Sequence, residues 1–228
     1  LYEITGSKLA LGILGLSEVI PAILLALPAG VKVDQSNKQR LISLCILLYL
    51  VIMLLMLLVT STYFLLHVPR AAVEWCIYLL VCATGAVRAF SSPAFNAFLA
   101  QLVKQEELVR AASVNSMAWL IAAVAGPATA GLLLGYTNIT TAFIIVCSMV
   151  FLSLLMIQKV PQKPVAYDPG KTKTWDSVKE GLEFVMNQKA LLGSMMLDMF
   201  AVLFGGAVAL LPVFAKDILH IGPQGLGW

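Results

Sequence analysis

Three charged residues lie inside long apolar segments of this 228-residue chain: Glu18, Arg88 and Asp198. An unpaired charge is costly in a hydrocarbon layer, so such residues commonly bind protons or substrates, or pair with one another. Glu18 precedes Pro21 by three residues, and a low-dielectric environment favours the protonated form of a carboxyl group. Glu18 is therefore a candidate for proton or substrate handling. The alternative is a polar contact with a neighbouring helix.

Arg88 and Asp198 are candidates for an ion pair between two groups of helices. We expect Asp198 within the inner leaflet and Arg88 near the cytoplasmic end of its helix, where a long side chain can extend to the interface. Breaking such a pair leaves a buried charge, so the pair would favour one of two arrangements. Asn96 and Asn115 would either line a cavity for an amphiphilic substrate, together with Trp119, or hydrogen-bond neighbouring helices.

The stretch "GVKVDQSNKQR", residues 30–40, is a charged island between two apolar runs. We expect Gly30 at the end of the first run, where a side chain would obstruct a close helix crossing. Asp34 then lies in a tight turn, where its carboxylate can cap the positive N-terminus of a neighbouring helix and pair with Lys38 or Arg40. Such a contact could stabilise one arrangement of two helical bundles and release another.

The apolar stretch "AAVAGPATAGLLLG" carries small residues at close spacing. Gly126 and Gly131 would let helices approach closely, and Pro127 removes a backbone donor and bends a helix. A packing motif without a role in transport is the alternative.

The elements that must position these residues are six apolar runs of about 20 residues, the length that a bilayer of about 30 Å requires. Hydrophobic residues make up 60% of the chain and charged residues 12%, against about 45–50% and 25% in an average soluble domain. The sequence therefore predicts an all-α membrane protein, a polytopic helical bundle. Its expected spans are Leu9–Ala29, Leu41–Thr60, Val73–Ser91, Ala112–Tyr136, Thr140–Ile157 and Leu191–Phe214.

Lys and Arg set the expected orientation, because positively charged loops stay in the cytoplasm. Loops 31–40, 100–111 and 158–190 hold eleven of these residues, whereas the opposite side holds three: Lys8, Arg70 and Lys216. The three loops are predicted to be cytoplasmic, and the net charge of +3 is a topology signal that gives no reason to expect nucleic-acid binding. Within the third loop, Trp175, Val178, Leu182 and Val185 recur at helical spacing and predict an amphipathic surface helix with Thr174 as N-cap.

Enzymatic chemistry is not indicated. The apolar runs contain no Ser/His pair, metal-ligand cluster or paired facing aspartates, and the sequence contains no Walker motif. His67 and His220 lack metal-ligand spacing. The four cysteines, Cys45, Cys76, Cys82 and Cys147, lie within predicted helices and are interpreted as packing residues. We expect no cofactor and no bound metal.

Gly30, Asp34 and Lys38 match the loop signature Gly-x-x-x-Asp-Arg-x-x-Arg-Arg, so the chain resembles the major facilitator superfamily. Gln35 and Gln39 depart from that signature, and Arg40 extends the basic cluster. Gly126–Pro127 and Ala130–Gly131 resemble the Gly-Pro-x-x-Gly-Gly signature of exporters in this superfamily. Further stretches, among them "RAFSSPAFNAFLAQLV", are similar to its enterobactin-exporter-like branch.

The resemblance implies a twelve-helix carrier in which the six runs are helices two to seven. Residues 1–157 would then belong to the N-terminal bundle, 158–189 to a cytoplasmic linker and 190–228 to the start of the C-terminal bundle. Because the chain begins at Leu1 and stops within "GPQGLGW", we expect a fragment of a longer polypeptide that is inactive alone.

The implied function is secondary active transport, in which two halves tilt alternately around a midplane cavity. It would be proton-coupled efflux of a small amphiphile, siderophore-like or drug-like, by a monomer in the lipid bilayer of the inner membrane. The alternatives are uptake or flipping of a lipid-like substrate with the same fold, and a non-transporting membrane anchor subunit.

Overall fold

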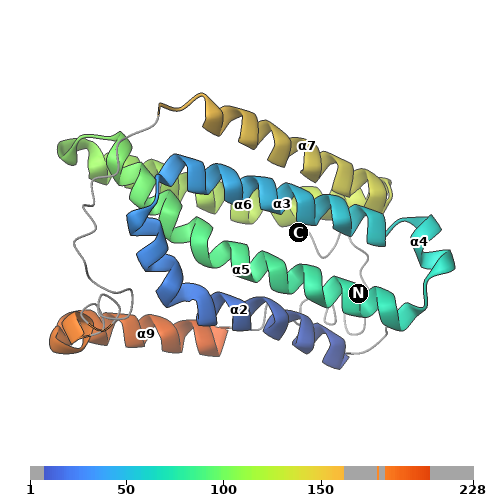
Figure 1. Ribbon diagram of the computed structural model, residues 1–228, viewed down its shortest axis with the longest axis horizontal. Coiled ribbons are helices and arrows are strands. Elements are labelled where there is room, and N and C mark those ends of the chain that lie inside the picture. Colours follow the sequence, from blue (N-terminus) through green and yellow to red (C-terminus); the bar gives the residue numbers. More distant parts are fainter. Residues whose placement is uncertain (1–7, 162–178, 180–182, 206–228) are drawn as a thin grey trace.

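The computed structural model describes residues 8–161, 179 and 183–205, which form a bundle of long helices (Figure 1). In chain order these are α2 (Lys8–Gln35), α3 (Lys38–Val59), α4 (Thr62–His67), α5 (Arg70–Leu102), the 3₁₀ helix η1 (Gln105–Glu107), α6 (Leu108–Tyr136), α7 (Ile139–Gln158) and α9 (Lys189–Gly205). Helices satisfy their own backbone hydrogen bonds, which is the requirement that a hydrocarbon solvent imposes on any spanning segment.

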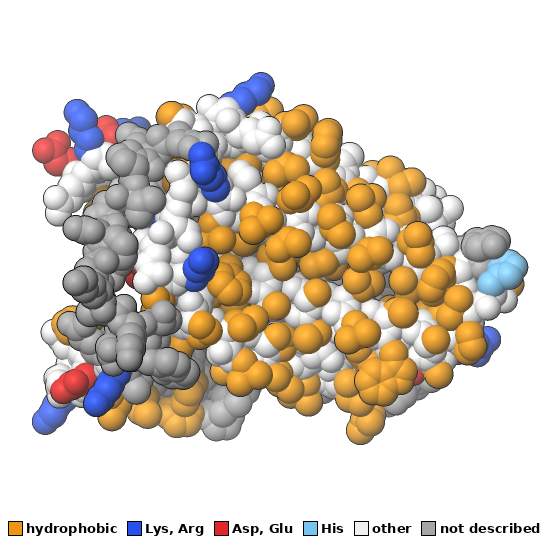
Figure 2. Space-filling view, viewed as in Figure 1, with side chains coloured by type: hydrophobic (Ala, Val, Ile, Leu, Met, Phe, Trp, Pro, Cys, Tyr) orange, Lys and Arg blue, Asp and Glu red, His pale blue; other side chains and the backbone are white. Residues whose placement is uncertain are grey.

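Five helical segments of the described part are long and apolar enough to cross a membrane: Leu9–Gln35, Lys38–Val59, Arg70–Leu102, Gln105–Tyr136 and Ile139–Gln158. They confirm the first five predicted spans. The sixth expected span, Leu191–Phe214, begins within α9, and its part after Gly205 lies outside the described residues. Hydrophobic side chains cover the middle of the face in Figure 2, while Lys and Arg gather toward the end that carries the α2–α3 turn.

Helix α5 is the centre of the bundle. It packs along α2 on one side and along α3 on another, and α3 also packs against α7. Three small apolar clusters follow the α3–α5 contact from one end to the other. Their buried members are Val33, Ile42, Ala94 and Phe98 in the first, Cys45, Ile52 and Val87 in the second, and Val59, Val73 and Ile77 in the third.

Two of the predicted cytoplasmic loops are much shorter than expected. Helix α2 runs on to Gln35, so only Ser36 and Asn37 separate it from α3. Asn37 is the N-cap, and its Oδ1 accepts a hydrogen bond from the backbone N–H of Arg40 at 3.1 Å. Residues 100–111 are likewise mostly helical, because α5 continues to Leu102 and α6 begins at Leu108.

Helix α5 also extends well beyond its predicted span of Val73–Ser91. Pro93 lies inside the extended helix. A proline removes its own backbone donor, a loss that a long membrane helix tolerates when neighbouring groups compensate. Two predictions change as a result: Arg88 is in the middle of α5 rather than near its cytoplasmic end, and Asn96 lies within the helix rather than beside a turn.

The predicted amphipathic helix of residues 175–185, with its N-cap at Thr174, lies largely outside the described residues. Residues 183–187 are helical.

Candidate functional site

At Gly85 the backbones of α2 and α5 are in close contact. A Cβ atom built on Gly85 would overlap the backbone carbonyl oxygen of Glu18 and would lie 2.9 Å from its carbonyl carbon. It would also lie 3.0 Å from Cγ of Pro21. Only glycine fits here without moving a helix, so Gly85 fixes how close the main chain at Glu18 comes to α5.

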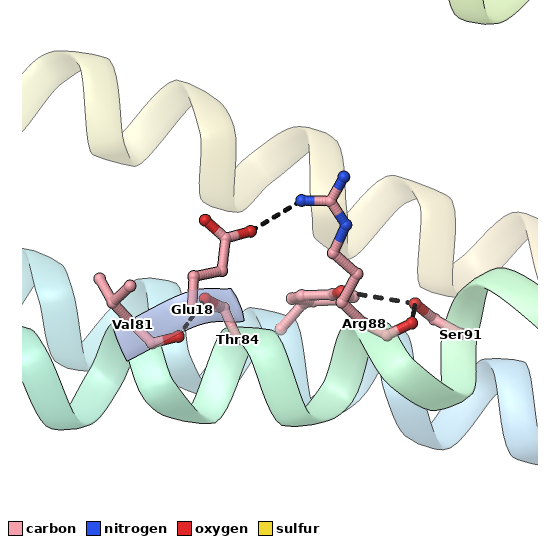
Figure 3. A network of polar contacts seen from close by, with 6 residues as sticks. Glu18, Val81, Thr84, Arg88 and Ser91 are labelled. Carbon is pink, nitrogen blue, oxygen red and sulfur yellow. Dashed lines mark hydrogen bonds and ion pairs between the residues drawn. The ribbon is translucent and has the colours of Figure 1, made fainter. Parts of the chain in front are cut away.

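Glu18 and Arg88 form an ion pair beside this crossing. The Arg88 Nη1 atom donates to Glu18 Oε1 at 2.7 Å. Figure 3 shows the two side chains extending from different helices toward one another, with Arg88 one turn beyond Thr84. The short distance and the opposite charges make this a charge-assisted hydrogen bond.

The depth of the pair follows from helix geometry. At a rise of about 1.5 Å per residue, Glu18 is about 25 Å from the end of α2 at Gln35, and Arg88 is about 21 Å from the end of α5 at Leu102. Both therefore lie well inside a hydrocarbon layer of about 30 Å. In the described structure their side chains are 39% and 67% exposed, respectively. Both side chains are thus only partly covered by other described residues at mid-helix.

This pairing replaces the one expected from the sequence. Arg88 binds Glu18 and not Asp198. Asp198 lies on α9, is exposed and has no ion-pair partner among the residues that the structure describes. The expectation was wrong because it placed Arg88 at the cytoplasmic end of a short span. The longer α5 instead brings Arg88 to the level of Glu18.

The charged turn does not use Asp34 as predicted. Its exposed carboxylate forms no ion pair within the described part of the chain, and the N-cap of α3 is Asn37. The buried ammonium group of Lys38 donates to the backbone carbonyl of Asp34 at 2.7 Å. Lys38 therefore supplies a hydrogen-bond donor to a main-chain carbonyl at the C-terminal end of α2. Arg40 is exposed next to this turn.

Gln39 makes a contact that the sequence analysis missed. Its side chain is 6% exposed, and its Nε2 donates to the carbonyl oxygens of Ile157 at 3.0 Å and Val160 at 2.9 Å. Ile157 is in the last turn of α7 and Val160 follows that helix, where backbone carbonyls run short of helical donors. The Ile157 carbonyl also accepts from the backbone N–H of Val160 at 3.3 Å. Gln39 was noted only as a departure from a basic signature. The departure supplies two donors without a buried charge.

At Gly30 and Gly126 the expected close crossing is not found among the residues that the structure describes. A Cβ at Gly30 or at Gly126 would meet nothing within 4 Å, and Gly30 lies inside α2 rather than at its end. Gly131 is buried on α6. Pro127 lies within the same helix, where the nearby Thr129 hydroxyl donates to the carbonyls of Ala125 and Gly126.

A cavity of about 800 Å³ lies among α3, α5, α6 and α7. Its wall includes Asn96, Asn115 and Trp119. This is the cavity-lining alternative of the two that the sequence left open for these residues. A second cavity of about 530 Å³ lies between α5 and α6 and shares Asn115 and Ala118 with the first. Asn115 thus borders both spaces.

The comparisons with known proteins agree with this helical architecture. A family model described as Major Facilitator Superfamily matches residues 1–228. The "Uncharacterized MFS-type transporter YfiS" of Bacillus subtilis is 23% identical, over 100% of this chain and 53% of its own length. "Macrolide efflux protein A" of Streptococcus pyogenes is 22% identical, over 98% of this chain and 54% of its own length. The chain thus spans about half the length of these relatives.

Proposed function

Because the chain belongs to the Major Facilitator Superfamily, a family of membrane transporters, we propose that the intact protein is a proton-coupled secondary transporter. It exports a small amphiphile across the inner membrane by alternating access. The likeness to a macrolide efflux protein supports export. The cationic residues at the α2–α3 and α5–α6 ends support a cytoplasmic position for that side of the bundle.

The observation that carries the proton-coupling part of this proposal is the ion pair of Glu18 and Arg88 at mid-helix. A proton on Glu18 would remove the charge that holds the Arg88 guanidinium, and the freed cation would need water or another partner. Loading and release of a proton would then change the contact between α2 and α5. In this scheme Glu18 binds the proton and Arg88 favours its release.

The pair is a reasonable switch because its two partners come from different helices, whose backbones come close together at Gly85. A local change there displaces whole helices rather than one loop. The cytoplasmic turn has a separate role: Lys38 and Gln39 hold the ends of α2 and α7 against α3. Asp34 and Arg40 remain exposed on this turn and are available to residues beyond the described part.

The test is transport by the intact protein in proteoliposomes under an imposed pH gradient. Erythromycin, a catecholate siderophore and the uncharged dye N-phenyl-1-naphthylamine serve as cargo. We expect gradient-driven movement of at least one of them, accompanied by proton flux. Glu18→Gln should abolish the response to the gradient and leave gradient-independent exchange measurable. Glu106→Gln is the matched control, because Glu106 is an exposed carboxylate in η1.

Two results would contradict the proposal. One is proton flux unchanged by Glu18→Gln, which would remove Glu18 from the coupling step. The other is equal loss of coupling in Glu18→Gln and Glu106→Gln, which would mean that any lost carboxylate has this effect.

A further inference from the structure

Helices α3 and α7 each line the cavity among α3, α5, α6 and α7 with one helical face. On α3 the lining residues recur at positions 42, 45, 46 and 49, and on α7 at positions 153, 156 and 157, followed by position 160 just beyond the end of that helix. This spacing of three, one and three residues is that of a single helical face. Helix α5 contributes two serines, Phe95 and Asn96, and α6 contributes Asn115 and Trp119. The space is therefore bordered by regular helices and not by loops.

The described wall of the cavity carries several polar groups but no charged side chain. None of the described residues that line this cavity is Asp, Glu, Lys, Arg or His. Hydrogen-bonding groups are nonetheless present: the amides of Asn96 and Asn115, and the hydroxyls of Tyr49 and Ser153. Neither amide side chain is hydrogen-bonded to another residue in the part of the chain that the structure describes. Apolar side chains and the Trp119 ring make up most of the remaining wall.

We propose that this cavity binds an uncharged amphiphile with a flat aromatic or alicyclic body. The volume of about 800 Å³ is within the range typical of sites for drug-sized ligands. The cavity is open on one side, since its wall residue Trp119 is 69% exposed. A charged ligand would still give up part of its hydration without finding a counter-charge on the wall, which is costly. An uncharged ligand avoids this cost, stacks on Trp119 and bonds to the two free amides. This inference rests on the proposed transport function and specifies its substrate class.

The cavity adjoins the proposed coupling pair through α5. Ser91 lines the cavity, and its hydroxyl donates to the backbone carbonyl of Arg88 at 3.4 Å. The Tyr49 hydroxyl lies 3.4 Å from the same Ser91 oxygen. Figure 3 shows the contact between Ser91 and Arg88 together with the Glu18–Arg88 pair. A ligand that touches Tyr49 or Ser91 therefore contacts the helical turn that carries Arg88.

The experiment is equilibrium binding to the intact protein in lipid nanodiscs, without a pH gradient. N-phenyl-1-naphthylamine is the uncharged probe, and 1-anilinonaphthalene-8-sulfonate is an anionic probe with a nearly identical ring system. Energy transfer from tryptophan reports binding near the protein, and empty nanodiscs give the background from lipid. Ala118→Phe fills the cavity from α6, whereas Ala123→Phe adds the same ring to α6 at a position that lines neither cavity.

We expect the uncharged probe to bind at least tenfold more tightly than the sulfonate. Ala118→Phe should weaken its binding at least tenfold, Asn115→Leu at least threefold, and Ala123→Phe less than twofold, in variants with unchanged helical content. Full binding in both Ala118→Phe and Asn115→Leu would overturn the proposal, because the probe would then bind at a place other than this cavity. Equal affinity for the two probes would overturn the uncharged substrate class.

Binding measured without a gradient and transport measured under a gradient separate this inference from the proposed function, since the residues that line the cavity do not include Glu18 or Arg88. Cavity-dependent binding without proton-coupled transport would uphold the site and reject the transport mechanism. Proton-coupled transport that Ala118→Phe does not affect would reject the site and leave the mechanism standing.

Discussion

The backbone carbonyl of Glu18 faces Gly85 so closely that a β-carbon at position 85 would overlap it. This contact joins α2 and α5 at the level of their ion pair. A single hydrogen atom as the side chain of residue 85 is what allows the acid on one helix to reach the base on the other.

Gly85→Ala should therefore separate the helices and destabilise the protein. Overpacking of this kind typically costs about 1–3 kcal/mol, and the shift should also lengthen the Glu18–Arg88 distance. Thermal unfolding in detergent measures the first effect, and proton-coupled transport measures the second. The matched control is Gly30→Ala, whose Cβ meets nothing within 4 Å. In a helix this change is neutral or stabilising by up to about 1 kcal/mol. Equal destabilisation by both variants would contradict the close-contact explanation.

Removing one partner of the ion pair should destabilise the protein more than removing both. Arg88→Gln leaves Glu18 charged at mid-helix, and Glu18→Gln leaves Arg88 without its counter-charge. The double variant leaves two neutral amides that can hydrogen-bond to each other. A double-mutant cycle measured by unfolding should give a coupling energy of about 0.5–3 kcal/mol, the range for residues in contact. Additive losses would show that the two side chains do not interact in the folded protein.

The stability of the protein should depend on both the charge and the hydrogen-bonding groups of the side chain at position 39. Gln39→Leu removes the side-chain donors to the carbonyls of Ile157 and Val160. It should cost about 1–3 kcal/mol, because the Val160 carbonyl loses the donor that the structure describes for it. Gln39→Glu keeps the shape but points a carboxylate at two carbonyl oxygens, so it should destabilise more than Gln39→Leu at neutral pH. Gln35→Glu is the control, since Gln35 is exposed at the end of the neighbouring helix. A smaller loss for Gln39→Glu than for Gln39→Leu would contradict the donor role.

The difference between prediction and structure has a physical cause in each case. The spans could be predicted because hydrocarbon requires long apolar segments, and Leu and Val runs report this directly. The ends of the helices could not, because Pro93 and the charged residues near 34 and 104 are tolerated within or beside helices that already have their hydrogen bonds. Because α5 is longer than predicted, Arg88 lies in the middle of the helix, and its partner is Glu18 instead of the expected Asp198.

Glycines show the same limitation at the level of packing. Gly30, Gly85 and Gly126 all lie in apolar helices, yet only Gly85 faces a neighbouring backbone closely. Motif matching favoured the other two because they belong to recognisable signatures. Which glycine is at a crossing depends on helix rotation and register, and neither is encoded in local spacing. The position of Gly85 three residues before Arg88 was the available signal, because residues at that spacing share a helical face.

The two ends of α3 should lie on opposite sides of the membrane, with the α2–α3 turn in the cytoplasm. A helix of 22 residues spans about 33 Å, which is enough to cross the hydrocarbon layer. Single-cysteine variants in a background without the four native cysteines test this: Gln35→Cys at the end of α2 and Leu66→Cys on α4, both at exposed positions. In intact cells a membrane-impermeant maleimide should modify Leu66→Cys and leave Gln35→Cys unmodified. Permeabilised cells are the control, in which both should react. Modification of Gln35→Cys in intact cells would reverse the orientation, and it would place Asp34, Lys38 and Gln39 on the outer side.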